Sequence, residues 1–307
     1  MKISTGLYFD RSTQQLSGVQ ARLTKVQEQL STGLQIVKPS DEPDKASLVT
    51  RLEGELARQA SYQETLKSVN VRLTAEETAL KNTSDVMYRI KELAVQAASD
   101  TVSAQDRQGI ALEISTLREQ ILTLANSQDS NGNYLFSGSK AGEPAFSKDA
   151  LGRVRYDGDQ ARMQVNVGDN RRMNLNMPGS DAFSRVVRDD AKGGKVGVDF
   201  FQSLADLTAA VNSSDRTAIH RGLAEVDMLQ QGISNGLGQI GADLSVVDLQ
   251  TNVLDQVVLR LKTTRSDIED LDYTEAITRM NKDQLALEAA QSSFAKISQL
   301  SLFKYLS

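Results

Sequence analysis

The chain has 307 residues with no cysteine, no tryptophan and a single histidine, and only 5% of its residues are aromatic. This composition excludes disulfides and thiolate metal sites, and it is typical of long packed helices rather than of a pocketed α/β enzyme. The formal net charge is −5 with scattered basic residues, so nucleic acid is not expected as the main partner. No apolar run approaches the ~20 residues of a membrane span, and the N-terminal residues lack the pattern of a secretory signal.

The first predicted element is an amphipathic helix at the N-terminus. Gly33 interrupts its pattern, and the segment KPSDEP follows at 38–43. A proline lacks an amide donor and biases the preceding residue towards an extended backbone, so no helix can continue through this segment. We expect an elbow here, with Ser40 or Asp41 capping the next helix. The elbow residues are Pro39, Ser40, Asp41 and Pro43, and the helix seam, spaced as in a coiled coil, is Phe9, Leu16, Val19, Leu23, Val26 and Leu30.

The inner elements follow the elbow. Short alternating runs punctuated by glycines fill segment 137–197, which predicts strands and turns. Apolar residues at steps of three and four predict helices on both sides of this segment. The predicted helices cover residues 62–97, 110–124, 199–211, 215–233 and 240–268.

The last predicted helix extends almost to the C-terminus. Each terminal helix carries a narrow apolar stripe that it cannot bury alone. Residues 1–40 carry five basic and two acidic side chains, and residues 268–307 carry four basic and six acidic ones, so the two ends attract each other weakly. The terminal helices therefore either pair with each other or wait for neighbouring copies of the chain, and we favour the second interpretation. The C-terminal seam is Ile277, Met280, Leu287, Phe294, Ile297, Leu302 and Leu306.

These elements predict a mainly α fold, in which long helices from both chain ends form coiled-coil-like bundles and a small β-rich domain is inserted between them. The expected parts are terminal helices at 1–38 with 272–307, a helical bundle at 39–136 with 198–271, and the insert at 137–197. The first two parts are discontinuous in sequence.

Catalytic and metal-binding patterns are missing. One histidine and no cysteine exclude Cys–His catalysis and zinc hydrolysis of the HExxH type. Asp129, Asn131 and Asn133 begin like a calcium loop, but the sixth position is Tyr134 instead of glycine and the twelfth is Lys140 instead of glutamate. We expect no enzyme activity, no cofactor and no metal.

Several segments resemble the flagellin superfamily of bacterial flagella. LSTGLQIVKPSDEPDKAS at 30–47 resembles the N-terminal signature of the superfamily, MKISTGLYFDRSTQQL at 1–16 resembles its start, and residues 268–306 are similar to its C-terminal helix. NGNYLFSG at 131–138 and LSLFKYL at 300–306 resemble the branch that forms the hook–filament junction.

This resemblance implies a structural adaptor that polymerises as a ring at the junction. It implies that both terminal seams are assembly interfaces, disordered in the free subunit, and that the elbow is a spoke between an inner tube and the next layer. Export through the flagellar type III apparatus, without a cleaved signal, would place the protein outside the cell. The implied partners are other copies of the chain, a hook-associated protein on the hook side, flagellin on the filament side and a chaperone on the C-terminal helix.

Three alternatives remain open at this stage. The chain could be flagellin itself and form the filament, or it could be a coiled-coil interaction module such as a type III effector. A hydrolase hidden in the insert is the third alternative. Self-polymerisation distinguishes the first two from a junction protein. Flagellin should form long filaments alone, a junction protein should stay mostly monomeric until a hook-type end is offered, and an effector should do neither.

Overall fold

The computed structural model describes residues 2–189 and 194–306, with the backbone alone for residues 2–6, 8 and 297–306. The fold is 70% helical and 9% strand, which confirms a mainly α protein with a small β-rich insert. Contacts group the residues into two compact units, 1–59 with 256–307 and 60–255. The three-part division at the elbow stays a prediction. No described helix is both long enough and apolar enough to cross a membrane.

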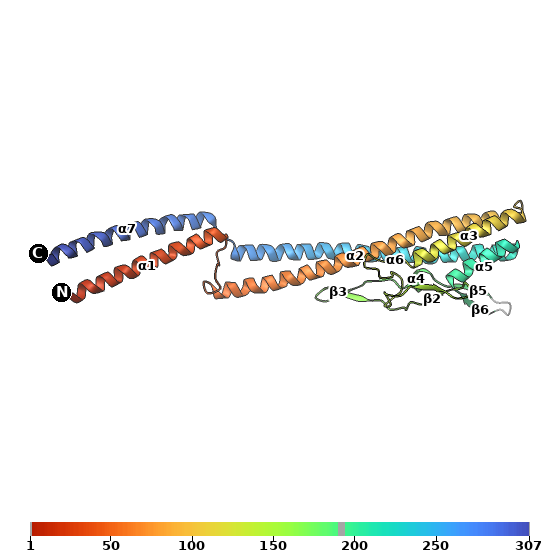
Figure 1. The fold of residues 1–307 in the computed structure, drawn as a ribbon, viewed down its shortest axis with the longest axis horizontal. Helices are drawn as coiled ribbons and strands as arrows, with labels where there is room; N and C mark the ends of the chain where they lie inside the picture. The colour runs from red at the N-terminus through yellow and green to blue at the C-terminus, as the bar shows by residue number, and fades with distance from the viewer. Residues whose placement is uncertain (1, 190–193, 307) are drawn as a thin grey trace. The chain divides into compact units, whose positions relative to one another are not determined.

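In the described chain, three helices precede a group of short strands with one short helix among them, and three helices follow it, as Figure 1 shows with their labels. The helices are α1 (Lys2–Thr32), α2 (Pro43–Ala98), α3 (Ala104–Ala125), α4 (Gly179–Ala182), α5 (Phe200–Ser213), α6 (Arg216–Glu269) and α7 (Tyr273–Leu306). The strands are β1 (Phe146–Lys148), β2 (Val154–Tyr156), β3 (Gln164–Gly168), β4 (Arg171–Asn174), β5 (Val186–Asp189) and β6 (Lys195–Val198).

The core of the second unit follows the predicted seams. Burying these aliphatic side chains provides most of the driving force for folding of this unit. Ser103 caps α3, and its hydroxyl accepts a hydrogen bond from the backbone amide of Asp106 at 3.1 Å. The buried seam residues are Leu66, Val69, Leu73, Leu80, Met87 and Ile90 on α2, Ile110, Ile114 and Ile121 on α3, and Ile240, Val247 and Leu254 on α6.

Helix α6 is continuous where the sequence predicts two segments, 215–233 and 240–268. Glycines interrupt the apolar pattern between these segments, which explains the prediction. In the structure Gly236 is a contact point, since a Cβ there would lie 3.2 Å from Leu80 Cδ1 and 3.3 Å from Ala182 Cβ. The helix therefore continues through this region because packing outweighs the weak helix propensity of glycine.

The insert consists of three antiparallel hairpins, β1–β2, β3–β4 and β5–β6, that form separate two-stranded sheets. An isolated two-stranded hairpin is marginal in water, so each hairpin needs support from the helices. Arg188 on β5 supplies one such link, with Nε 2.7 Å from Glu225 Oε1 on α6 and Nη1 2.7 Å from Asp206 Oδ2 on α5. Phe146, Val167, Met173 and Val186 of the hairpins belong to the same core as the helices, whereas Val187 and Val196 are exposed.

Candidate assembly surface

Helices α1 and α7, which come from opposite ends of the chain, lie side by side in the first unit (Figure 1). The rings of Phe9 and Phe294 meet edge to face with centroids 5.4 Å apart. Arg22 Nε lies 3.4 Å from Asp283 Oδ1, so one of the oppositely charged pairs between the ends is formed. Phe9 of one predicted terminal seam and Phe294 of the other therefore meet within one subunit.

Among the described side chains, the buried cluster of this helix pair is small. It consists of Val26, Leu271 and Ala276, and Leu30 and Met280 pack partly against them. The predicted residues Leu16, Val19, Leu23 and Leu287 are only half-buried. The side chains of Ile297, Leu302 and Leu306 lie outside the described residues.

The seam of α7 is shifted by one position from the predicted seam at its start. Ala276 is buried, whereas the neighbouring Ile277 is 45% exposed. The less exposed positions continue through Met280, Asp283 and Leu287, which keeps the steps of four and three residues. An apolar scan misses Ala276 and Leu271, because one is small and the other precedes the helix. Leu7 and Leu285 are also exposed, at 55% and 68%, so apolar surface remains uncovered on this pair.

The elbow is held by backbone hydrogen bonds to the turn before α7. The amide of Gln35 donates to the carbonyl of Glu269 at 2.7 Å, and the amide of Leu271 donates to the carbonyl of Gly33 at 3.0 Å. Gly33 has a φ of +73°, which only glycine adopts without strain. We call this pair of reciprocal bonds the backbone clasp. The clasp joins the residues that follow the end of α1 to the residues that precede the start of α7.

Charged side chains complete the elbow. Lys25 Nζ lies 3.1 Å from Asp41 Oδ1, and Lys38 Nζ lies 3.1 Å from Glu28 Oε2. Helix α2 begins at Pro43, so the cap position falls on Glu42, whose carbonyl accepts from the amide of Ala46, rather than on Ser40 or Asp41. A proline at the first helical position suits a helix start, because its missing amide would have no intrahelical partner. Pro39 is exposed on the same segment.

The calcium-like segment is a closed turn. Asp129 Oδ1 accepts hydrogen bonds from the backbone amides of Asn131 at 2.8 Å and Asn133 at 2.9 Å. Its Oδ2 lies 3.4 Å from Arg72 Nη1. The pKa of Asp129 is lowered because these hydrogen bonds and the Arg72 charge outweigh the effect of partial burial. The carboxylate is thus engaged by the chain itself.

The following segment, Tyr134–Gly138, is part of the core. Leu135 and Phe136 are almost completely buried. Arg72 Nη2 donates to the carbonyls of Tyr134 and Leu135 at 3.2 and 3.0 Å. The motif NGNYLFSG therefore fixes the chain between α3 and the insert against α2.

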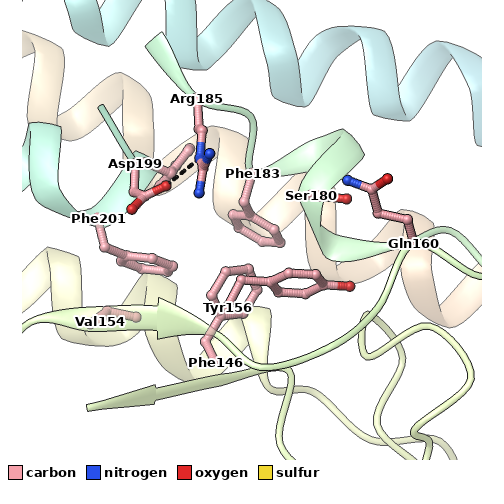
Figure 2. A pocket seen from close by; sticks show the side chains of 10 residues that line it. Phe146, Val154, Tyr156, Gln160, Ser180, Phe183, Arg185, Asp199 and Phe201 are labelled. Atoms are coloured by element: carbon pink, nitrogen blue, oxygen red, sulfur yellow. Dashed lines mark hydrogen bonds and ion pairs between the residues drawn. The ribbon is translucent and has the colours of Figure 1, made fainter. Parts of the chain in front are cut away.

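An aromatic pocket of about 370 Å³ lies where the first hairpin meets α4 and α5 (Figure 2). Among the lining residues, Phe146, Tyr156, Phe183 and Phe201 lie close together, and the rings of Phe146 and Phe183 meet edge to face with centroids 5.3 Å apart. Arg185 Nε and Asp199 Oδ1 form an ion pair at the rim, 2.5 Å apart. Within residues 2–189 and 194–306, no cluster of His, Cys, Asp or Glu is placed to hold a metal ion.

Comparison with known proteins gives matches along the whole chain. It is 27% identical to flagellar hook-associated protein 3 of Escherichia coli (strain K12) and 26% identical to the protein of that name from Salmonella typhimurium, with 99% of each chain covered. The flagellin of Bacillus subtilis is 24% identical over 97% of both chains.

Solved structures share the fold. The hook-associated protein 3 of Legionella pneumophila has a TM-score of 0.65 at 17% identity, covering 72% of this chain and 98% of its own. The FlgL protein of Xanthomonas campestris has a TM-score of 0.62 at 23% identity, covering 71% of this chain and 99% of its own.

Two family models cover most of the sequence. The model of the bacterial flagellin N-terminal helical region matches residues 2–141, and that of the C-terminal helical region matches residues 223–306. Together these matches include well over half of the residues, at both ends and in the right order. The chain therefore belongs to the flagellin family and is a structural component of the bacterial flagellum.

Proposed function

We propose that this chain is an adaptor that assembles between the flagellar hook and the flagellar filament. Its likeness to two hook-associated proteins 3 extends over 99% of both chains, and the flagellin matches are slightly less similar. The single observation that carries the proposal is the small core of the terminal pair. Among the described side chains of this pair the buried cluster is Val26, Leu271 and Ala276, which stabilises the pair weakly, so neighbouring subunits cover the exposed apolar side chains.

The exposed terminal residues are the proposed assembly interface. Ile277 and Leu285 keep large apolar surfaces in water, and each buried methylene gains about 0.8 kcal/mol. The seams of both terminal helices pack into a tube of several copies, and the elbow at 39–43 leads outward as a spoke. The terminal helices are disordered in the free subunit and become ordered when copies assemble.

The proposed partners follow from this position. Other copies of the chain form the ring, a hook-associated protein contacts it on the hook side, and flagellin contacts it on the filament side. The chain reaches this extracellular site through flagellar export, and a chaperone covers the C-terminal helix before export.

The test is hydrogen–deuterium exchange on the purified full-length chain, alone and after incubation with isolated hook ends. We expect amides in residues 9–32 and 275–296 to exchange quickly in the free chain and to become protected on hook ends. Amides around Ile114, in the core of the second unit, provide the internal control and should be protected in both states.

Three results would contradict the proposal. Long filaments growing from the chain alone would make it a flagellin. Terminal helices that are already protected in the free chain would make α1 and α7 an ordinary intramolecular pair. If the chain did not bind hook ends, it would be a coiled-coil interaction module and not a junction protein.

A further inference from the structure

Helix α6 carries a second apolar stripe that the chain does not cover. Val246, Leu249 and Val253 are 43%, 59% and 43% exposed, while Val247 and Leu254 on the same stretch are buried. With Ala242, the exposed residues follow steps of four, three and four, the spacing of a helix-packing seam. We call Ala242, Val246, Leu249 and Val253 the α6 ridge.

Helix α2 carries a complementary hollow. An open groove of about 370 Å³ runs along Val71, Ala75 and Thr78 and is closed on its other side by Leu124 and Leu135. Val71 is 54% exposed although it lies beside buried positions of α2. The volume accommodates several aliphatic side chains. We call this hollow the α2 groove.

The ridge and the groove lie on roughly opposite sides of the α2–α6 pair. These helices are neighbours in the second unit, since Gln63 Nε2 donates to Asp255 Oδ1 at 2.6 Å and Gln230 Nε2 donates to Ser84 Oγ at 2.7 Å. At 3.6 residues per turn, both exposed stripes point away from the seams between the helices. One subunit thus offers a ridge on one side and a groove on the other.

The two surfaces also lie at the same level along the bundle. Val71 follows Gln63 by eight residues, and Val247, beside the ridge, precedes Asp255 by eight residues, on helices that run in opposite directions. Because the ridge and the groove lie at the same height along the bundle, a contact between them places neighbouring subunits side by side. Such subunits are related mainly by a rotation, with little shift along the bundle axis. Repeated head-to-tail contacts of this kind close into rings or extend as helices.

Exposed charges of opposite sign flank the two surfaces. Asp248 lies exposed beside the ridge, and Lys67 lies exposed near one end of the groove. Lys81, near the other end, is paired within its own helix, with Nζ 2.7 Å from Glu77 Oε1. Opposite charges at the rim of an interface favour correct pairing more than they add affinity.

We propose that the α6 ridge of one copy packs into the α2 groove of the next copy. The inference rests on the proposed function, because it supplies a side contact between the subunits of the ring. It adds a second interface to the terminal helices, and its occupant is another copy of the same chain.

Cross-linking tests this contact, because the chain has no cysteine of its own. The variant Val71→Cys with Leu249→Cys replaces the natural protein in flagellated cells, and isolated hook–filament complexes are treated with a short bismaleimide. We expect a ladder of covalent oligomers of the chain. The matched control combines Leu249→Cys with Val95→Cys, which is equally exposed at 55% but lies about 36 Å further along α2. The control should give no ladder.

The outcomes separate this inference from the proposed function. Filaments that attach normally while no ladder forms would overturn the ridge–groove contact and leave the junction role intact. A product that joins the Leu249→Cys chain to a different flagellar protein would overturn it as well. Absence of the unsubstituted chain from the junction would overturn the proposed function itself, and the ridge–groove contact with it.

A second variant keeps the test valid if the cysteine variants do not assemble. Leu249→Asp places a charge in the ridge, and we expect it to lower incorporation at the junction about tenfold with an unchanged melting temperature. Leu112→Asp, on an exposed leucine of α3 outside both surfaces, is the control and should incorporate normally. Normal incorporation of Leu249→Asp would overturn the proposal.

Discussion

Glu76 is the most unusual single residue of the second unit, because its side chain is completely buried on the seam of α2. Burial raises the pKa of Glu76 from 4.5 to about 8, and the charge of Asp243 adds to this effect. Arg72 Nε at 3.4 Å and the amide of Met177 favour the ionised form, but within the described structure neither carboxylate oxygen has a hydrogen bond of good geometry. Burial therefore favours the protonated form of Glu76 in the folded chain.

The pKa of Glu76 predicts how stability depends on pH. Between pH 4.5 and about 8 the unfolded chain loses this proton and the folded chain keeps it, so the free energy of unfolding falls as pH rises. Glu76→Gln removes the titrating group and should stabilise the chain by a few kcal/mol at pH 8 but hardly at pH 4.5. Urea unfolding of both chains at these pH values measures the difference. An advantage that does not grow with pH would mean that Arg72 keeps Glu76 ionised.

At the scale of elements, the elbow depends on one glycine. A Cβ on Gly33 would lie 2.9 Å from the hydroxyl oxygen of Tyr273, and the φ of +73° disfavours any β-carbon. Gly33→Ala should weaken the backbone clasp by about 1–2 kcal/mol. In chains assembled on hook ends, the amides of Gln35 and Leu271 should then exchange roughly ten times faster.

The control for this prediction is a glycine without a special conformation. Gly54 lies in α2, and a β-carbon added there would have no neighbouring atom within 4 Å, so Gly54→Ala should leave the clasp unchanged. Equal exchange of Gln35 and Leu271 in both variants would show that the elbow does not need the left-handed residue.

The sequence predicts side-chain seams well and backbone contacts poorly. Large aliphatic residues at regular steps made the cores of α2 and α3 predictable, and the half-buried side of α1 follows the same rule. The buried position Ala276 of α7 was not predicted, because an alanine gives little hydrophobic signal beside Ile277. The backbone clasp between Gly33 and Leu271 uses only main-chain groups, so no pattern of side chains in the sequence predicts it. The α6 ridge was not predicted because its apolar pattern is less regular than that of the buried seam, whose residues alternate with it along the same helix.

At the scale of the whole molecule, the two units differ in how much apolar surface they bury. The second unit has one continuous core that includes residues from α2, α3, α5, α6 and the insert. In the described part of the first unit, the cluster between the terminal helices has three buried residues, Val26, Leu271 and Ala276. Regions with few buried contacts open at low free energy, whereas a large core unfolds cooperatively. The stability measured for the chain should therefore be that of the second unit.

Two alanine substitutions compare the units directly. Ile114 is 0% exposed in the large core, and Ile114→Ala should cost about 2–5 kcal/mol and lower the main thermal transition by roughly 5–15 °C. Val26→Ala, at a residue 6% exposed between the terminal helices, should leave that transition unchanged and weaken binding to hook ends. Calorimetry and a hook-end binding assay measure the two effects. If Val26→Ala lowered the main transition as well, the terminal helices would belong to the cooperative core, and the assembly interface would have to lie elsewhere.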